Sequence, residues 1–342
     1  MNDFFKLIRS YLMEYLPKQK CFSENTVKSY RDALNLLIEY LRSEKQLEVR
    51  QIRFDLFDRV LILGYLDWLE KTRLCSATSR NQRLMVLRSF FKYAGQMDCT
   101  QVALQVEVED IPTKKVPGKI VEFLSEDALQ ALLRQPDAAT PKGVRNQFFM
   151  VLMYDTAARC GELLNLRVRD LRINTCHPVV YLTGKGDKTR SVPLMPKTVA
   201  HCKQYLRIFH SENTSNGESP LFYTEIHGAR QMMSADNVAA FMKKYGEAAR
   251  LDCTEIPKRV HPHQLRHTRA IHFYRAGMPL SLLSEYLGHA NAETTKIYAY
   301  ADTEMKRAAI EKADHLRKGI PPPVSIWEND EDMILRLSGL KC

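Results

Sequence analysis

The sequence of 342 residues lacks the features that mark secreted, metal-stapled or membrane-spanning proteins. Its eight cysteines are scattered and form no Cys-x-x-Cys pair, which argues against a disulfide framework and a structural zinc site. The N-terminus mixes charged with apolar residues and lacks a cleavable signal pattern, and no apolar run approaches the length of a membrane span. There is no internal repeat and no low-complexity tract. These absences favour a globular protein with reduced thiols, and the expected location is the cytoplasm.

A surplus of acidic residues is also missing. The chain holds 50 Lys and Arg against 40 Asp and Glu, a formal net charge of +10, and most of this excess lies beyond residue 110. Such a balance favours a polyanionic partner over a neutral one, although many soluble proteins are equally basic. The length is comfortable for two separate hydrophobic cores.

Apolar residues recur at helical spacing along most of the chain, which predicts a mainly α protein with a small β-sheet. In the first part, the predicted helices are 1–16 (ended by Pro17), 24–42 (capped by Ser23), 58–71 and 76–95. Periodicity then breaks in a segment with three Pro or Gly residues, which predicts a linker. We expect a helical domain over 1–110, a linker over 111–122, a second domain over 123–318 and a tail over 319–342.

The second domain is expected to begin with a helix capped by Ser125, followed by a strongly apolar helix over 146–158. The run VVYLTGKGDKTRSVPL predicts a β-hairpin around a Gly-Lys-Gly turn. Further helices are predicted over 196–210, 235–251 and 303–314. After three consecutive prolines, the last residues predict a short amphipathic helix that could pack back on its own domain.

The stretch from 260 to 301 concentrates the reactive side chains of the chain. It holds four clustered histidines, the lone His289, the arginines Arg266 and Arg269, and the tyrosines Tyr298 and Tyr300. Arginines bind phosphate oxygens bidentately, imidazoles move protons, and a tyrosine hydroxyl can serve as a nucleophile. This mixture is suited to chemistry on a phosphate.

The order of these motifs resembles that of the tyrosine recombinases, the family of the phage integrases and of the Xer and Cre proteins. The resemblance rests on HPHQLRH, LGH and TTKIY, on the upstream TAARCGELLNL, and on the lysine of the hairpin. The spacing of nine residues between His289 and Tyr298 fits the family. One departure is small, because the usual Thr-Gly before the first arginine is replaced here by Thr156 and Ala157.

The resemblance implies an N-terminal helical, SAM-like core-binding domain that clamps DNA, and an α/β catalytic domain. It implies a site-specific recombinase that forms a 3′-phosphotyrosine intermediate without metal or cofactor. The implied catalytic residues are Arg159, Lys185, His263, Arg266, His289 and Tyr298, supported by Glu162 and His267. In these roles the arginines bind the non-bridging oxygens, His267 and His289 add hydrogen bonds, Lys185 protonates the leaving oxygen and His263 assists the nucleophile.

The implied partner is double-stranded DNA with inverted half-sites, bound by a dimer and synapsed by a tetramer. The resemblance also implies that the last helix could dock on a neighbouring protomer, as an alternative to packing on its own domain. The basic residues of the fourth helix would be either a solvated face or a surface for the DNA backbone, and the resemblance favours the second. The candidate DNA contacts are Thr78, Arg80, Arg83, Arg88, Lys92, Lys114, Lys115, Lys188 and Arg190.

Several alternatives remain at this stage. Lys188 or Arg190 could be mistaken for the hairpin lysine, and Tyr300 competes with Tyr298 as the nucleophile. His263 and His267 share a helical face, but no His-Glu-x-x-His pattern or nearby carboxylate accompanies them, so a zinc site is disfavoured. A relaxing topoisomerase of the tyrosine type is the nearest enzymatic rival. A DNA-binding accessory protein with an inert site is a rival of another class.

Overall fold

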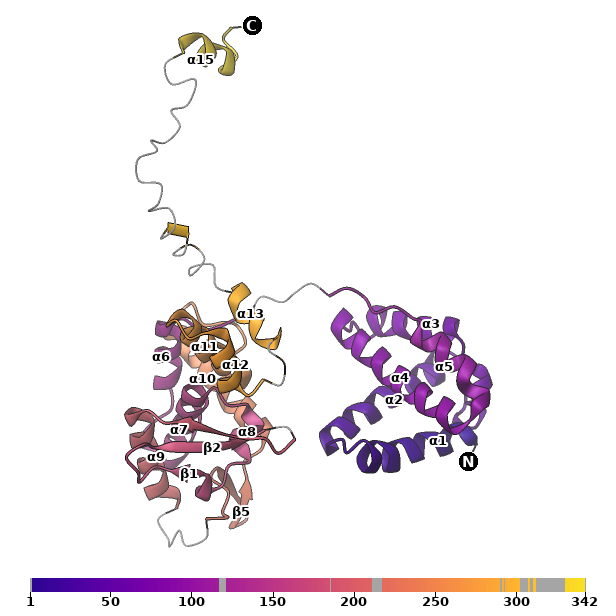
Figure 1. Ribbon diagram of the computed structural model, residues 1–342, viewed down its shortest axis with the longest axis horizontal. Coiled ribbons are helices and arrows are strands. Elements are labelled where there is room, and N and C mark those ends of the chain that lie inside the picture. Colours follow the sequence, from indigo (N-terminus) through magenta and orange to yellow (C-terminus); the bar gives the residue numbers. More distant parts are fainter. Residues whose placement is uncertain are drawn as a thin grey trace. The chain divides into compact units, whose positions relative to one another are not determined.

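The computed structural model divides into two compact units, Met1–Lys119 and Ile120–Cys342 (Figure 1). The residues described here are 2–116, 121–184, 186–210, 217–289, 291, 293–301, 307, 310–311 and 330–341, without the side chains of 226, 300 and 301. The predicted catalytic Lys185, the side chain of Tyr300 and most of the predicted helix 303–314 therefore lie outside the described residues. The mainly α architecture with small antiparallel sheets confirms the predicted fold class.

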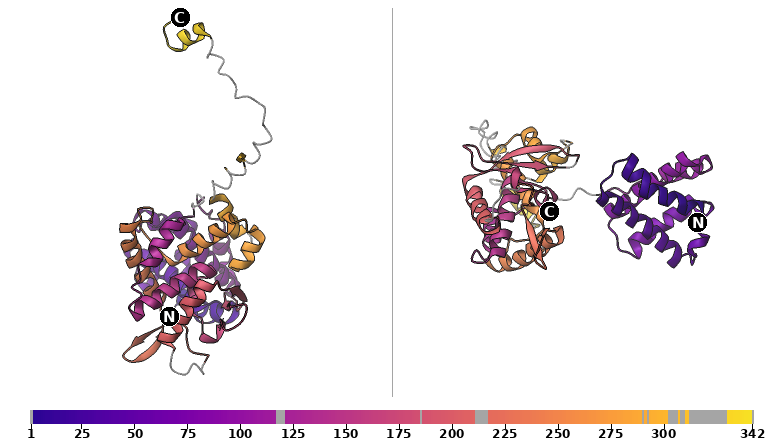
Figure 2. Two further views of the ribbon diagram at one scale, coloured as in Figure 1. Left: turned by 90° about the vertical axis from the view of Figure 1, so that its left-hand side faces the viewer. Right: turned by 90° about the horizontal axis from the view of Figure 1, so that it is seen from below.

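The first unit is helical throughout, as Figure 2 shows from two further sides. Its helices are α1 (Asp3–Ser10), α2 (Glu24–Ser43), α3 (Arg59–Lys71), α4 (Ala77–Met97) and α5 (Val102–Glu109), with short 3₁₀ turns at Val49–Gln51, Phe54–Leu56 and Cys99–Gln101. Side-chain caps begin four of them, because the oxygens of Asn2, Ser23, Asp58 and Ser76 accept hydrogen bonds from backbone N–H groups of the first turn. Helix α5 was not predicted.

One predicted boundary in this unit was wrong. The first helix does not end before Pro17, because α1 continues into a π-helical segment, Tyr11–Gln19, that contains this proline. The backbone N–H of Lys20 bonds the carbonyl of Tyr15 five residues earlier, at 2.9 Å. This wider turn accommodates a proline ring, which would clash with the carbonyl four residues earlier in an α-helix.

The start of the predicted linker is bound to helix α4. Asn81 and Lys114 form a reciprocal pair, in which the Asn81 amide donates to the Lys114 carbonyl at 2.8 Å and the Lys114 N–H donates to Asn81 Oδ1 at 3.0 Å. The guanidinium of Arg80 donates to the carbonyl of Pro112 at 3.3 Å, and that of Arg88 donates to the carbonyl of Ile111. Side chains of the predicted DNA-facing helix thus also hold the chain that leaves it.

Replacing Asn81 with alanine is expected to release this segment. Both hydrogen bonds of the pair are lost at a partly exposed site, so the cost is about 1 kcal/mol and the unit remains folded. Limited trypsin digestion of the full chain then accelerates at Lys114 and Lys115. Gln82→Ala, an amide on the same helix that does not touch the segment, is the matched control. Equal digestion rates for the two variants would contradict the expectation.

The second unit contains the helices α6 (Glu126–Arg134), α7 (Pro141–Thr156), α8 (Cys160–Leu164), α9 (Pro196–Phe209), α10 (Ala235–Asp252), α11 (Pro262–Arg275), α12 (Leu280–Leu287), α13 (Glu293–Ala301) and α15 (Glu331–Leu337). The strands β1 (Leu171–Arg172), β2 (Val179–Thr183) and β3 (Thr189–Pro193) form one antiparallel sheet in that order. The strands β4 (Tyr223–Ile226) and β5 (Ala229–Met232) form a separate hairpin, which was not predicted.

Two hydrophobic clusters hold the site of interest in this unit. The larger one surrounds α7, whose Phe148, Phe149 and Met153 are fully buried. The smaller one joins Ala157, which follows α7, to residues of α11, α12 and α13, including Tyr298. Because α7 reaches both clusters, the turn at its C-terminal end is fixed by buried contacts on both sides.

Candidate active site

The candidate site begins at the turn between α7 and α8. Ala157 has a left-handed backbone with φ of 48°, a conformation that favours glycine, and it occupies the position of the glycine that the family usually carries. Before it, the hydroxyl of Thr156 donates to the carbonyl of Leu152 at 2.6 Å and accepts from the N–H of Ala158. The turn places Arg159 at the N-cap of α8, immediately before its first residue, where the Arg159 side chain is 40% exposed.

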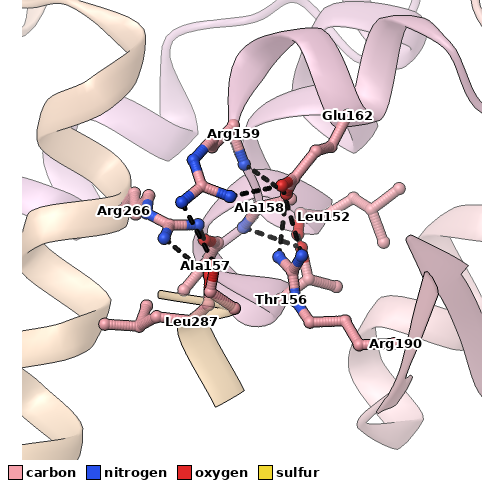
Figure 3. Close-up of polar contacts among 10 residues, drawn as sticks. Leu152, Thr156, Ala157, Ala158, Arg159, Glu162, Arg190, Arg266 and Leu287 are labelled. Carbon is pink, nitrogen blue, oxygen red and sulfur yellow. Dashed lines mark hydrogen bonds and ion pairs between the residues drawn. The ribbon is translucent and has the colours of Figure 1, made fainter. Parts of the chain in front are cut away.

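Glu162 binds two arginines from different elements. Its carboxylate accepts from Arg159 Nη1 at 2.7 Å and, across the sheet, from Arg190 Nη2 of β3 at 2.8 Å. It also accepts from the backbone N–H of Arg159 at 2.9 Å. Burial alone would raise the pKa of Glu162, but the hydrogen bonds from Arg190 and Arg159 outweigh it and hold this pKa below its usual value. Glu162 is therefore an ionised clamp that orients Arg159 (Figure 3).

Arg266 on α11 is the largest fully buried side chain among the described residues. Its guanidinium donates to the carbonyl of Ala157 at 2.7 Å and to the carbonyl of Leu287, at the end of α12, also at 2.7 Å (Figure 3). Burial, and secondarily the neighbouring Arg159, lower the pKa of Arg266 to about 10, so it stays charged at neutral pH. Its Nε has no hydrogen-bond partner here.

Tyr298 on α13 points into the same site. The side chain is 1% exposed, and its hydroxyl lies 3.0 Å from Nδ1 of His267, which follows Arg266 on α11. The ring of His263, one helical turn earlier, meets the His267 ring edge-on with centroids 4.3 Å apart. Burial raises the pKa of Tyr298, and the positive charges of Arg266 and Arg159 offset part of this rise.

His289 closes the site from the loop after α12. Gly288 before it has a left-handed backbone with φ of 61°, and its carbonyl accepts from Arg159 Nη2 at 3.3 Å. Nδ1 of His289 lies 2.8 Å from the hydroxyl of the buried Thr295, which fixes the ring against α13. The loop therefore connects the first arginine to the helix that carries Tyr298.

The structure brings together most residues that the sequence motifs singled out. Arg159, Glu162, His263, Arg266, His267, His289 and Tyr298 all belong to this one site. Lys185 lies outside the described residues, but the hairpin that carries it reaches the site, because a methyl group placed on Gly184 would lie 3.1 Å from Glu162 Oε1. Lys188, beyond the turn, is exposed.

The residues predicted to contact DNA fall into two groups. Thr78, Lys92, Lys115 and Lys188 are exposed, and Arg83 is partly exposed. In contrast, Arg80 is 5% exposed and Arg88 bonds a carbonyl, Lys114 pairs with Glu70 at 2.6 Å, and Arg190 pairs with Glu162. The second group therefore has structural partners in the free chain, and contact with DNA stays a prediction for both groups.

Two features of the site were missed from the sequence. The pairing of Arg190 with Glu162 depends on the register of β2 with β3, which the sequence does not specify. The ion pair between Asp155 and Arg269, at 3.2 Å, joins residues 114 positions apart. One indication of a role for Arg269 was present in the sequence, which is its position one helical turn after Arg266.

Across the described ranges, no three or more His, Cys, Asp or Glu side chains come together in a way that could hold a metal ion. The described helices also include none that is both long enough and apolar enough to cross a bilayer.

The histidines of the site predict a pH-dependent stability. Burial first, and nearby cationic or imidazole groups second, lower the pKa of His267 and of His289 to about 4, against 6.5 ordinarily. Between pH 4 and 6.5 the unfolded chain binds more protons at these two histidines than the folded chain does. Their contribution to the free energy of unfolding is therefore fully present above pH 6.5 and is lost as the pH falls toward 4. We expect the melting temperature to decrease as the pH is lowered from 7.5 to 5.

The measurement is thermal unfolding followed at several pH values. The variants His267→Gln and His289→Gln are each expected to flatten the slope, because each removes one group with a lowered pKa. His177→Gln, at an exposed histidine, is the matched control and should leave the slope unchanged. A slope that neither site variant reduces would contradict the assignment.

Comparison with known proteins identifies the family. Residues 122–305 match the phage integrase family, and residues 8–97 match the phage integrase N-terminal SAM-like domain. A tyrosine recombinase of Pseudothermotoga lettingae is 31% identical over 301 residues, which cover 87% of this chain and 95% of that protein. The tyrosine recombinase XerC of Oceanobacillus iheyensis is 29% identical over 316 residues, covering 92% and 97%.

A solved structure shares the fold. The Tn1549 transposon integrase in complex with transposon right end DNA has a TM-score of 0.66 at 18% identity, over 88% of this chain and 97% of that one. The present chain belongs to the phage integrase family, which confirms the resemblance of its motifs. Its enzyme class is that of the tyrosine recombinases, and its activity is site-specific recombination of DNA.

Proposed function

We propose that this chain cuts and rejoins DNA strands through Tyr298, with a 3′-phosphotyrosine intermediate. The observation that carries the proposal is the contact of the Tyr298 hydroxyl with His267, beside a guanidinium that is fully buried. A phenol, an imidazole and cations in one pocket are the groups that attack on an anionic phosphodiester requires. The intermediate conserves the energy of the broken bond, so rejoining needs no nucleotide.

Each group has one task in this reaction. Arg159 and Arg266 bind the non-bridging oxygens of the phosphate, and His267 and His289 add hydrogen bonds to them. The oxygen of Tyr298 forms a bond to phosphorus, and the bond from phosphorus to the 5′ oxygen breaks. His263 takes the phenolic proton, and Lys185 gives a proton to the leaving oxygen. In rejoining, a 5′-hydroxyl attacks and each proton returns.

The free chain holds this site closed. Tyr298 and Arg266 are both buried, and α13 packs on α11 and α12 through the smaller hydrophobic cluster. A phosphate therefore reaches them only after α13 shifts. In the closed state His267 binds the phenol itself, and we propose that it turns to a phosphate oxygen when DNA enters. The same residue then serves both states.

The proposed partner is double-stranded DNA with inverted half-sites. The net charge of +10 and the exposed Thr78, Lys92, Lys115 and Lys188 supply backbone contacts of low sequence specificity. A dimer would occupy the two half-sites, and two dimers would form the tetramer that exchanges strands. The physiological reaction would be integration and excision, transposition of a mobile element, or resolution of chromosome dimers.

The tail helix α15 offers a surface for assembly. It exposes Ile334 and Leu337 (44% and 69%), and Leu340, just beyond the helix, is 77% exposed. These residues form an exposed apolar surface that another surface could cover. That cover is either its own domain or the neighbouring protomer. Sedimentation of the full chain on DNA, with and without residues 330–341, separates the two, because only trans docking makes the dimer depend on the tail.

The test of the proposed function is the trapping of a covalent adduct. Footprinting on the DNA that flanks the gene first locates the bound segment. Duplexes with a nick near each candidate cleavage point then let the short fragment with the 5′-hydroxyl diffuse away, so that rejoining fails. We expect a protein–DNA adduct that resists denaturant. Binding without an adduct would indicate an accessory protein, and relaxation of any supercoiled plasmid would indicate a topoisomerase.

A further inference from the structure

A partly buried ion pair lies near the turn that carries Arg159, and the proposed reaction does not use it. Asp155, in the last turn of α7, and Arg269, on α11, approach to 3.2 Å between Oδ1 and Nη2. Their side chains are 12% and 19% exposed. Among the described residues, the hydrogen bonds and ion pairs of Asp155 and Arg269 go to groups other than those assigned to the phosphate. A pair withdrawn from water contributes little net stability, so its value lies in the geometry that it imposes.

Both carboxylate oxygens and the backbone carbonyl of Asp155 accept hydrogen bonds. Its second carboxylate oxygen accepts a hydrogen bond from the hydroxyl of Thr198, near the start of α9. Its backbone carbonyl accepts from the hydroxyl of Tyr286 on α12, at 2.8 Å. Together with Arg269, these contacts join three other helices to one residue of α7. The final turn of α7 therefore cannot rotate without breaking several bonds at once.

Arg269 is held as firmly as Asp155. Its guanidinium lies over the ring of Phe273 at 4.1 Å and over that of Tyr154 at 4.8 Å, and Nη1 donates to the Tyr154 hydroxyl at 3.3 Å. That hydroxyl in turn lies 2.8 Å from Nδ1 of His272. A planar cation stacked between two rings has one orientation, which a lysine ammonium would not reproduce.

The spacing along both helices relates this pair to the site. Arg266 and Arg269 are one turn apart on α11, and their partners Ala157 and Asp155 are two residues apart on the other chain segment. Helix α11 thus holds the end of α7 at two successive points, immediately before Arg159. The second of these points is Ala157, whose backbone is left-handed. A small rotation of the backbone there would move Arg159 considerably.

We propose that Asp155 and Arg269 are positioning residues, which fix the α7–α8 turn so that Arg159 and Arg266 meet the same phosphate. This inference rests on the proposed function of those two arginines. The pair sets the register of α11 against α7, and Arg266 and the turn follow that register. Errors on the order of 1 Å in such groups cost about 100-fold in rate.

The test compares the cleavage rate with DNA affinity and folding in the full chain. Asp155→Asn and Arg269→Gln are expected to lower the single-turnover rate at saturating nicked DNA by about 10- to 100-fold, with Kd unchanged within about twofold. Because the two residues act as a unit, the double variant should be no slower than the slower single variant. Arg207→Gln, at an exposed arginine of α9, is the control.

A second readout does not require activity. In the free chain, the Arg266 guanidinium protons are expected to exchange slowly because the side chain is fully buried, and Asp155→Asn should accelerate their exchange by about 10-fold. If the Asp155→Asn variant unfolds below the assay temperature, the Thr198→Val variant is used in its place. Thr198→Val removes one hydrogen bond to Asp155 and nearly conserves the side-chain volume. Rates that fall only with the folded fraction, and unchanged Arg266 exchange, would overturn the inference. Absence of an adduct in the wild type would instead overturn the proposed function.

Discussion

Replacing Tyr298 with phenylalanine is expected to abolish the covalent adduct while DNA binding persists. The substitution removes the only atom that would attack phosphorus and leaves the ring in its buried place. Loss of a nucleophile lowers such a rate by more than about 10⁴-fold. The lost contact with His267 costs only about 1 kcal/mol of stability. Denaturing gels with labelled nicked DNA measure the adduct, and gel shifts measure the binding.

The matched control is Tyr274→Phe, a partly buried tyrosine of the neighbouring helix α11. It should form the adduct at the wild-type rate. An adduct that persists in Tyr298→Phe and disappears in Tyr300→Phe would transfer the nucleophilic role to Tyr300. Loss of DNA binding in Tyr298→Phe would mean that its hydroxyl supports the fold of the site more than its chemistry.

Replacing Arg159 with lysine is expected to lower the cleavage rate by about 10²- to 10³-fold. The guanidinium binds Glu162 and the Gly288 carbonyl through different nitrogens, so it is oriented before a phosphate arrives. A lysine keeps the charge but cannot make this fork, and the transition state loses an oriented donor. Because Arg159 is 40% exposed, the variant should fold normally, unlike variants of the fully buried Arg266.

Single-turnover cleavage of nicked DNA measures the effect, and Arg207→Lys serves as the control for a conservative change at an exposed arginine. A drop in affinity with an unchanged rate at saturating DNA would contradict the expectation. That result would mean that Arg159 binds the substrate and its transition state equally.

The sequence predicted the local features well, because they depend on neighbouring residues. Ser23 and Ser125 each begin a helix through a side-chain cap, as expected from their positions before apolar periodic runs. Pro17 did not end its helix, since a π-helical turn absorbs it. The strand β5 was missed because all four of its side chains are exposed and show no alternation, and its partner β4 is only four residues long.

Within the site, the spacing of Arg159 and Glu162 by three residues was sufficient to predict their pairing. The family motifs selected the remaining groups of the site. Nothing in the sequence indicated that Glu162 also binds Arg190, or that Arg266 is fully buried, since both depend on how distant elements pack. The contact of Asp155 with Arg269 belongs to the same class of tertiary information.

The concealed phenol has a consequence for the safety of the genome. A basic protein of this kind encounters unrelated DNA far more often than its own target, because chromosomes offer about 10⁶–10⁹ competing positions. An open nucleophile would turn some of those encounters into strand breaks. Tyr298, the nucleophile that we propose, is 1% exposed, and its hydroxyl lies 3.0 Å from His267 Nδ1, so unrelated DNA that contacts the free chain would not reach it. Restricted access to this hydroxyl would then prevent cleavage of unrelated DNA. The protein would depend less on a large difference in affinity between target and unrelated DNA.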